Sequence, residues 1–407
     1  MDNSNTEIQK AFNDHSKINK MAVYIDDKQL VPDDIISFEL TTSFFGIEQY
    51  AQLHINDSHE YFETLKIQTS PLITIEIVDI SNKKIQKIFT IIDINYYPVN
   101  ETKKSLTINM QDIFSSILSM IYISKSFNEG PIAAFKQLLE EALQKQTSTT
   151  DKIDDVLKKF YINNKIKIDS ESGSYKDADN KACFVVPQDR TFYQFFLDYF
   201  NLFGIRMWQD NDSLHIVKDE INQLPVLTND DNEVLGYSNV SQIKNHPMYI
   251  LDYNVQTRQE DKLTKVLPKT KVFRFDHKKI NNTNSVEISD AIQSIKFNAH
   301  NEKTGLTEIG NVFGEKYSLF STTLKDTQAI LTENMYMQNK TLELFVNGSF
   351  LLNNVGQMIG VTIKRTGVLP KNETQNMEIS GFFLITKVSH KIINNNYIAK
   401  LTLNSLS

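Results

Sequence analysis

The sequence is poor in the residues that usually reveal a protein's chemistry. There is one cysteine, Cys183, so no disulfide can form within the chain, and no Cys/His pattern has zinc-site spacing. We expect Cys183 to be a small buried residue of a protein that folds in a reducing cytoplasm. No run of about 18 apolar residues occurs, and residues 1–20 are polar. We therefore expect neither a signal peptide nor stable insertion into a membrane.

Excess positive charge is also lacking. The net charge of −7 argues against general binding to nucleic acid, which requires a basic surface. One local strip could contact phosphates and stack bases. It comprises Lys262, Lys265, Lys269, Lys271, Arg274, Lys278 and Lys279, with Phe273 and Phe275 between them. An edge strand whose lysines discourage aggregation, or a charged seam between subunits, would explain the same residues.

Motifs for catalysis or metal binding are missing as well. His54 and His59 are five residues apart, which matches no zinc-ligand spacing. The acidic run 229–233 lacks the alternating ligands of a calcium loop, so a solvated turn is expected there. Glu140 and Glu141 could serve as carboxylates of a glycoside hydrolase, but they also fit a solvated helix face. We predict no catalytic, cofactor-binding or metal-binding residues and therefore no enzyme.

What the sequence does contain is a long series of short amphipathic strands. Its 407 residues are enough for two to four domains. After an N-terminal arm at residues 1–20, apolar and polar residues alternate up to Asp112. Strands are predicted at residues 22–25, 35–40, 50–55, 72–78, 89–96 and 105–110. Six strands in so short a segment predict a small antiparallel barrel-like domain at residues 21–112.

The periodicity changes after Asp112. Helices are predicted at residues 113–121, 131–143 and 191–200, followed by a hairpin at 203–217 that contains Trp208. We interpret residues 113–220 as an inserted α/β module. Residues 221–407 return to short strands and form a second barrel-like domain, with an insertion at about 276–340 that includes a predicted helix at 325–338. The predicted fold class is thus mainly β with an inserted α/β module.

One strand segment of the first β region matches a segment of the second β region without gaps. Phe89–Tyr96 aligns with Phe383–His390, so the apolar residues share one register. After a turn, residues 106–109 match residues 401–404, and upstream residues 72–78 correspond loosely to 357–363. Any two amphipathic hairpins resemble each other, but the length of this match favours a duplicated β unit. Three copies of such a chain would present six similar units around an axis.

Three segments carry a resemblance to a known family. They are Thr41–Ser58, the stretch from Thr191 to Asp210 with its Trp208-Gln209-Asp210, and the C-terminal part from Val346 through Gly356 to Asn396. Together they resemble the central baseplate hub proteins of T-even-type contractile-tail phages. More distantly, they are similar to the N-terminal hub part of type VI secretion spike (VgrG) proteins. The ordered set spans most of residues 20–407.

This resemblance implies a structural role. It implies a homotrimeric ring of barrel-like domains in the virion tail baseplate, assembled in the host cytoplasm. The ring would join the tail tube or its adaptor proteins to the cell-puncturing spike, contact other baseplate proteins and let DNA pass without specific binding. Two alternatives stay open from the sequence: a tail-tip module that binds or degrades the cell wall, and a nucleic-acid-binding β protein.

Overall fold

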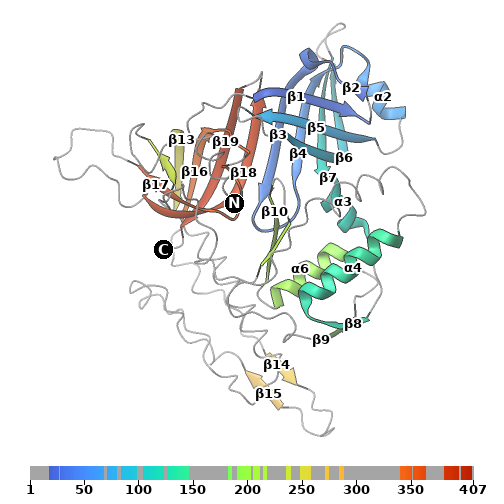
Figure 1. Ribbon diagram of the computed structural model, residues 1–407, viewed down its shortest axis with the longest axis vertical. Helices are drawn as coiled ribbons and strands as arrows, with labels where there is room; N and C mark the ends of the chain where they lie inside the picture. Colours follow the sequence, from blue (N-terminus) through green and yellow to red (C-terminus); the bar gives the residue numbers. More distant parts are fainter. Residues whose placement is uncertain are drawn as a thin grey trace, which may run out of the picture.

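The computed structural model shows a mainly β protein with a helical part beside the sheets (Figure 1). It describes the following residues: 18–26, 28–67, 71–79, 84–98, 104–122, 126–145, 182–185, 190–202, 205–210, 214–217, 235–239, 248–257, 271–274, 284–287, 340–350, 352–363, 380–393 and 396–405. Within these ranges, no helix has the length and hydropathy needed to cross a membrane. The predicted mainly β class with a helix-containing part is confirmed.

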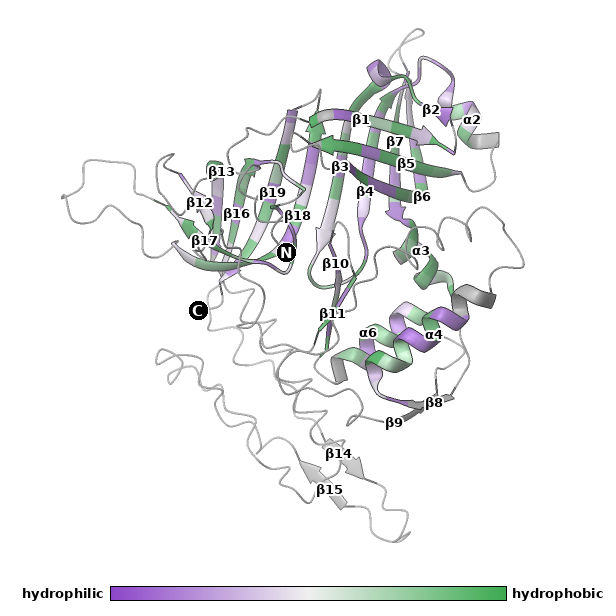
Figure 2. Ribbon diagram, in the orientation of Figure 1, coloured by the Kyte–Doolittle hydropathy of each residue, from purple (hydrophilic) through white to green (hydrophobic). Residues whose placement is uncertain are grey.

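Strands from both ends of the chain form one thirteen-stranded sheet, in the order β17-β12-β13-β16-β19-β18-β3-β4-β7-β6-β5-β1-β2. Its N-terminal members are β1 (Ile18–Ile25), β2 (Lys28–Gln29), β3 (Ile35–Ser43), β4 (Tyr50–Asn56), β5 (Leu72–Asp79), β6 (Lys84–Pro98) and β7 (Lys104–Asp112). The short helices η1 (Pro32–Asp34) and α2 (Tyr61–Ile67) lie between them in sequence. Green and purple alternate along these strands in Figure 2, as expected for a sheet with one buried face.

The C-terminal members close into a barrel. They are β12 (Gly236–Ser238), β13 (Met248–Thr257), β16 (Lys340–Asn347), β17 (Met358–Thr362), β18 (Gly381–Ile393) and β19 (Asn396–Ser405). An additional β17–β18 pairing completes the circle of six strands. The short β12 is parallel to both of its neighbours, so the barrel is mixed and the prediction of an antiparallel barrel is wrong at this strand. Among the described strands, only this set closes by hydrogen bonding.

The same five-stranded pattern occurs twice in the chain. We call β3, β4, β5, β6 and β7 the N-unit, and β13, β16, β17, β18 and β19 the C-unit. In each unit the first strand pairs with the second, the second with the fifth, the fifth with the fourth and the fourth with the third. All of these pairings are antiparallel.

Two irregularities are also shared. The register shifts at Ile92 in β6 and at Thr386 in β18, two positions that the sequence alignment places opposite each other. It shifts again at Ile36 in β3 and at Leu251 in β13. Bulges re-aim a strand at a defined point, so two matching bulges strengthen the equivalence of the units beyond shared alternation.

The predicted match of Phe89–Tyr96 with Phe383–His390 is confirmed strand for strand. The other two predicted alignments are wrong in register. Strand pairing aligns residues 108–112 with 401–405, two positions away from the predicted match of β7 with β19. It aligns Leu72 with Met358 rather than with Gln357. Alternation alone constrains which face a residue occupies and leaves the exact partner open.

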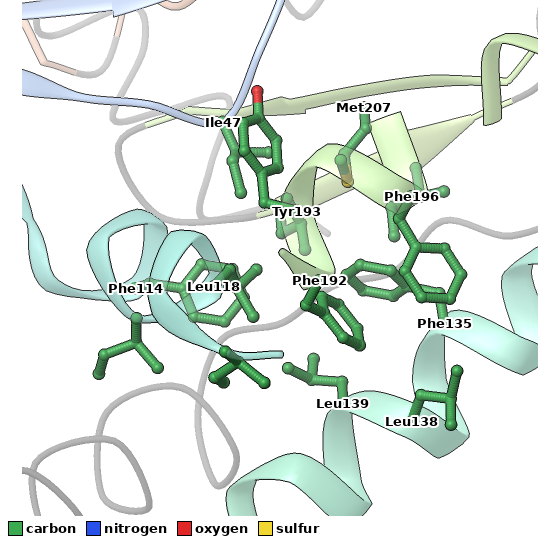
Figure 3. Close-up of a cluster of buried hydrophobic side chains, with 14 of the residues drawn as sticks. Ile47, Phe114, Leu118, Phe135, Leu138, Leu139, Phe192, Tyr193, Phe196 and Met207 are labelled. Carbon is green, nitrogen blue, oxygen red and sulfur yellow. The ribbon is translucent and has the colours of Figure 1, made fainter. Parts of the chain in front are cut away.

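A helical part with its own core lies beside the sheets (Figure 1). It contains α3 (Ile113–Met120), β8 (Ser126–Glu129), α4 (Pro131–Lys145), β9 (Ala182–Val185), α6 (Phe192–Leu202), β10 (Arg206–Gln209) and β11 (Leu214–Val217). Figure 3 shows aromatic side chains of α4 and α6 packed together, with Phe135 5.3 Å from Phe192 and 5.1 Å from Phe196 between ring centres. This core is distinct from the hydrophobic clusters of the N-unit and the C-unit.

The predicted strands and helices of the described regions are confirmed, with small changes at their ends. The strand β1 begins at Ile18 and so includes the last three residues of the predicted arm. The sequence analysis did not predict α2, β12 or the β8–β9 pair. The predicted helix at 325–338 lies outside the described residues. The strands β14 (Lys271–Arg274) and β15 (Asn284–Glu287) form a separate two-stranded pair.

Candidate functional site at the junctions between units

The two histidines considered as metal ligands, His54 and His59, lie in different surroundings. His54 lies in β4, where its backbone pairs with Ser37 and Thr107. His59 instead follows β4, and its Nδ1 lies 2.8 Å from the Asp34 carboxylate. Within the described part of the chain, no group of three or more His, Cys, Asp or Glu residues could hold a metal ion.

Asp34 is the centre of a small polar clamp between η1 and the start of α2. Its carboxylate accepts hydrogen bonds from Ser58 and from Tyr61, at 2.9 Å for the latter, in addition to its contact with His59. Burial alone would raise the pKa of Asp34, but these hydrogen bonds outweigh it and lower the pKa below its ordinary value. The clamp fixes the turn that leaves β4.

Other candidate residues lie apart from one another. Glu140 is exposed on α4, and Glu141 accepts a hydrogen bond of 3.2 Å from Gln137 one turn earlier, as on a solvated helix face. Cys183 lies in β9, and Lys271, Phe273 and Arg274 of the basic strip lie in β14; only their backbone positions are described. The acidic run 229–233 and the remaining residues of the basic strip lie outside the described residues.

The β10–β11 hairpin joins the helical part to the N-unit through buried polar groups. The Gln49 side-chain amide donates to the backbone carbonyl oxygens of Gln209 and Asp210, at 3.3 and 2.7 Å. Lys87 of β6 donates to the Gln49 side-chain oxygen at 2.8 Å and to the Asp210 carbonyl oxygen at 3.4 Å. Both side chains are buried. Because buried polar groups need defined partners, this network fixes where the hairpin sits.

Asp112 extends the same network toward the helices. It ends β7 and caps α3, where its carboxylate accepts from the backbone N–H groups of Phe114 and Ser115 at 3.0 and 3.3 Å. Its own N–H donates to the carbonyl oxygen of Gln49 at 2.9 Å. The Gln209 amide also reaches its carboxylate, at 3.4 Å. One fully buried residue therefore contacts the N-unit through its backbone N–H, and α3 and the hairpin through its carboxylate.

The same hairpin contacts the C-unit through apolar surface. The buried Trp208 lies 4.8 Å from Phe44 and 4.9 Å from His215 between ring centres. Gly356 has a φ of +80°, and a Cβ added there would lie 2.8 Å from the Trp208 ring. The backbone of Gly356 also donates to the carbonyl oxygen of Ile385 at 2.9 Å. Close approach and a left-handed backbone both require glycine at this position.

The helix α6 adds a third attachment. The Tyr193 hydroxyl donates to the Glu48 carboxylate at 2.7 Å. Burial, followed by the bond and charge of Glu48, raises the pKa of Tyr193 far above its ordinary value. The phenol therefore stays protonated and continues to donate. In Figure 3 its hydroxyl points away from the aromatic cluster formed by the rest of the helix face.

These contacts bring together the segments that carry the family resemblance. The first segment contributes Phe44 to Gln49, the second Trp208-Gln209-Asp210 and the third Gly356. Sequence analysis missed Lys87. It stands between Ile85 and Phe89 on the buried side of an alternating strand, and a charged residue at such an apolar position was the available signal.

A second junction, the seam, joins the N-unit to the C-unit directly. In it β18 pairs antiparallel with β3, from Lys387 opposite Ser43 to Ile393 opposite Ser37. On the outer face, Thr41 donates to Ser389 at 3.3 Å, and Ser389 donates to Glu39 at 2.6 Å. The inner face is fully buried, as described next.

The inner face of the seam contains a buried histidine. His390 is opposite Leu40, accepts a hydrogen bond from Tyr397 at 2.7 Å when Nδ1 is unprotonated, and stacks on Phe350 at 4.4 Å. Burial, with a smaller contribution from the charge of Lys87, lowers the pKa of His390 to about 3. The ring is therefore neutral at pH 7, and the seam behaves as a packed interior.

No family model matches the chain, and no curated protein sequence matches it. Among solved structures, the 43 kDa tail protein of prophage MuSo2 from Shewanella oneidensis is similar, with 10% identity and a TM-score of 0.56 over 96% of this chain and 98% of that chain. The tail protein from Neisseria meningitidis MC58 has 10% identity and a TM-score of 0.55, over 96% and 97%.

A type VI secretion component of E. coli has 9% identity and a lower TM-score of 0.47, over 97% of this chain and 77% of that chain. Matches at identities this low show a similar fold and say nothing about activity. The similarity to phage tail proteins that the sequence predicts is confirmed at this level: the chain has the fold of these tail proteins over nearly its whole length.

Proposed function

We propose that this protein is a non-enzymatic hub subunit of a phage-type tail baseplate. Three copies would form a ring that joins the tail tube to the cell-puncturing spike. The fold of phage tail proteins supports the setting. The observation that carries the proposal is the five-stranded pattern present twice in one chain, with matching bulges.

The duplication offers a way to match two symmetries. A ring of three chains contains three N-units and three C-units, which makes six similar units around one axis. Such a ring is threefold toward a trimeric partner and nearly sixfold toward a hexameric one. The seam supports this arrangement, because it already sets two successive units side by side within one continuous sheet.

The proposal includes two related β domains and their boundaries. The division is an arm at 1–20, a β domain at 21–112, an α/β module at 113–220 and a second β domain at 221–407. Three hydrophobic clusters support it, because each is drawn mainly from one of the three folded parts. The junction around Gln49, Lys87 and Asp112 would hold the three parts as one rigid subunit. No catalytic, cofactor-binding or metal-binding residue is assigned.

The remaining parts of the proposal concern location and partners. The protein would assemble in the host cytoplasm and reside in the tail baseplate of the virion. Its partners would be the spike, the tube or its adaptor proteins and neighbouring baseplate proteins, with DNA passing through the ring without specific contacts. The overall negative charge is compatible with weak affinity for phosphates.

The mass of the assembly tests the proposal. Light scattering on the full chain, alone and with the tube and spike proteins of the same tail, should give three times the chain mass in at least one mixture. Electron microscopy of that species should show a ring with a central opening. A chain that remains monomeric in every mixture would contradict the hub. Loss of turbidity of a cell-wall suspension with the protein alone would instead favour a cell-wall-degrading module.

A further inference from the structure

Among the residues that the structure describes, two strand edges are unpaired although the equivalent edges of the other unit are paired. In the seam, the outer edge of β3 pairs with residues 387–393 of β18. The counterpart of β3 is β13, whose edge from Ile250 to Thr257 opposite β16 has no partner among the residues that the structure describes. The counterpart of that part of β18 is Asp93–Pro98 of β6, which pairs with β7 alone within the described residues.

Burial differs between these counterpart positions in a consistent way. Phe38 and Leu40 of β3 are each 1% exposed in the seam, whereas their counterparts in β13, Tyr253 and Val255, are 40% exposed and half-buried. In β18, His390 is fully buried, whereas its counterpart Tyr96 in β6 is only half-buried. The seam covers Phe38, Leu40 and His390, whereas their counterparts at the two open edges are partly exposed to solvent.

We propose that β13 of one copy pairs with β6 of the next copy and so repeats the seam between subunits. The inference rests on the proposed ring and names its interface. The register follows from the seam: Ser389 opposite Thr41 becomes Asn95 opposite Gln256. By the same transfer Tyr96 lies opposite Val255, and Ile94 lies opposite Thr257. Around the ring, β13–β6 pairings between subunits would then alternate with β18–β3 pairings within each subunit.

The chemistry of both edges fits this pairing. On the inner face, Tyr96 would cover Val255, as His390 covers Leu40 in the seam. Tyr96 already stacks on Phe62 at 4.7 Å, as His390 stacks on Phe350 at 4.4 Å, and in both units the stacking partner follows the second strand. On the outer face the Asn95 and Gln256 amides can exchange the hydrogen bond that Thr41 and Ser389 make in the seam.

The two edges also lack the usual protection against pairing. Exposed edge strands commonly carry lysine or proline to prevent association with other chains. Residues 91–97 of β6 and 250–257 of β13 contain no Lys, Arg or Pro, and the one proline of the β6 edge, Pro98, is its last residue. They expose Ile92, Tyr97, Leu251 and Tyr253 instead. A second copy of this chain is the partner whose edge matches them in register, face and composition.

Site-directed disulfides test the pairing and its register. In the full chain with Cys183→Ser, Asn95→Cys and Gln256→Cys are introduced together and oxidised. Directly opposed residues of antiparallel strands have Cα atoms about 4.5–5.5 Å apart, within disulfide range. The expected result is a covalent trimer on a non-reducing gel, with a peptide that links positions 95 and 256 in its mass spectrum.

Two matched controls complete the experiment. Thr41→Cys with Ser389→Cys, the counterpart pair in the seam, should give a disulfide within one chain and no covalent oligomer. Asn95→Cys with Asp252→Cys shifts the second cysteine four residues along the strand, roughly 13 Å, and should give little cross-linking. A ring of three chains by light scattering without the 95–256 link would overturn this pairing and leave the hub standing. A chain that is monomeric in every mixture would overturn both.

Discussion

The N-unit and the C-unit each consist of five strands paired in the same order, but the strands at their edges have different neighbours. In the C-unit, the short β12 bridges β13 and β17 and closes the barrel. In the N-unit, β5 continues to β1 instead, and β3 continues into β18 of the other unit. One pairing pattern can therefore close on itself or extend toward a neighbour, and the strands at its edges decide which.

The units differ again in how they hold the β10–β11 hairpin. The N-unit holds it with hydrogen bonds from the buried side chains of Gln49 and Lys87. The C-unit holds it through the contact of Gly356 with Trp208. Polar networks specify a position, whereas apolar packing contributes mainly through burial. The N-unit thus fixes the position of the hairpin through hydrogen bonds, and the C-unit buries its apolar surface.

The largest expected effect on the free energy of unfolding distinguishes the paired edge of β3 from the open edge of β13. Leu40→Lys places a charge in the buried inner face of the seam and should lower the free energy of unfolding by roughly 3–5 kcal/mol. Val255→Lys at the counterpart position should lower it by less than about 1 kcal/mol but prevent assembly. Urea unfolding followed by Trp208 fluorescence, with light scattering, measures both. Equal destabilisation by the two changes would mean that Val255 is already covered within one chain.

The next effect distinguishes the inner faces of the units by their response to acid. His390 has a pKa of about 3 in the folded protein and about 6.5 when unfolded, so the unfolded chain binds more protons between these values. Its contribution to stability is complete above pH 6.5 and falls by up to roughly 1.4 kcal/mol per pH unit below it. His390→Gln should flatten the dependence of the unfolding midpoint on pH between about 6.5 and 4.

The N-unit supplies the control for that prediction. Tyr96 is the counterpart of His390 and has a phenol in place of the imidazole. Tyr96→Phe should therefore leave the slope of stability against pH unchanged. A variant with His390→Gln that kept the full slope would show that acid acts on another group.

A smaller effect concerns the apolar attachment of the hairpin. Gly356→Ala should destabilise the chain by roughly 1–3 kcal/mol, because it strains a positive φ and forces a Cβ onto Trp208. Gly381→Ala is the matched control, since its φ is also positive but nothing lies within 4 Å of the added Cβ. Only Gly356→Ala should shift the fluorescence of Trp208. Identical losses and spectra in the two variants would remove the Trp208 contact as the cause.

The smallest effect is expected on the outer face of the seam. Lys391 lies 3.9 Å from Glu39, and both side chains are substantially exposed. Glu39→Gln keeps a hydrogen-bond acceptor for Ser389 and should change the free energy of unfolding by less than about 0.5 kcal/mol, less still in high salt. Chemical denaturation at two salt concentrations measures it. A loss above 2 kcal/mol would place this face of the seam in the buried core.

The sequence predicts the strands well because alternation is a local property. The segment Phe89–Tyr96 shows which side chains face inward, and its match with Phe383–His390 holds in the structure. The alignments beside it slip by one or two residues. Register depends on turn length and on bulges such as those at Ile92 and Thr386, which leave no clear mark on alternation.

The junctions were less accessible to prediction. The pairing of β18 with β3 joins residues more than 340 positions apart, and neither strand carries a mark of its partner. Lys87 resembles any strand lysine until its neighbours Ile85 and Phe89 are seen to be buried. By contrast, Trp208-Gln209-Asp210 was singled out from the sequence and lies at the junction. Long-range placement is set by tertiary packing, which local patterns do not encode.

The strand β18 is hydrogen-bonded along both edges, to β19 on one side and to β17 and then β3 on the other. Neither half of the chain can lose this strand without opening the sheet of the other. Heating or denaturant should therefore melt both halves in one cooperative transition rather than one after the other. If limited proteolysis removed only the amino-terminal half, the edge of β18 that pairs with β3 would become unpaired. The remaining fragment should then tend to aggregate.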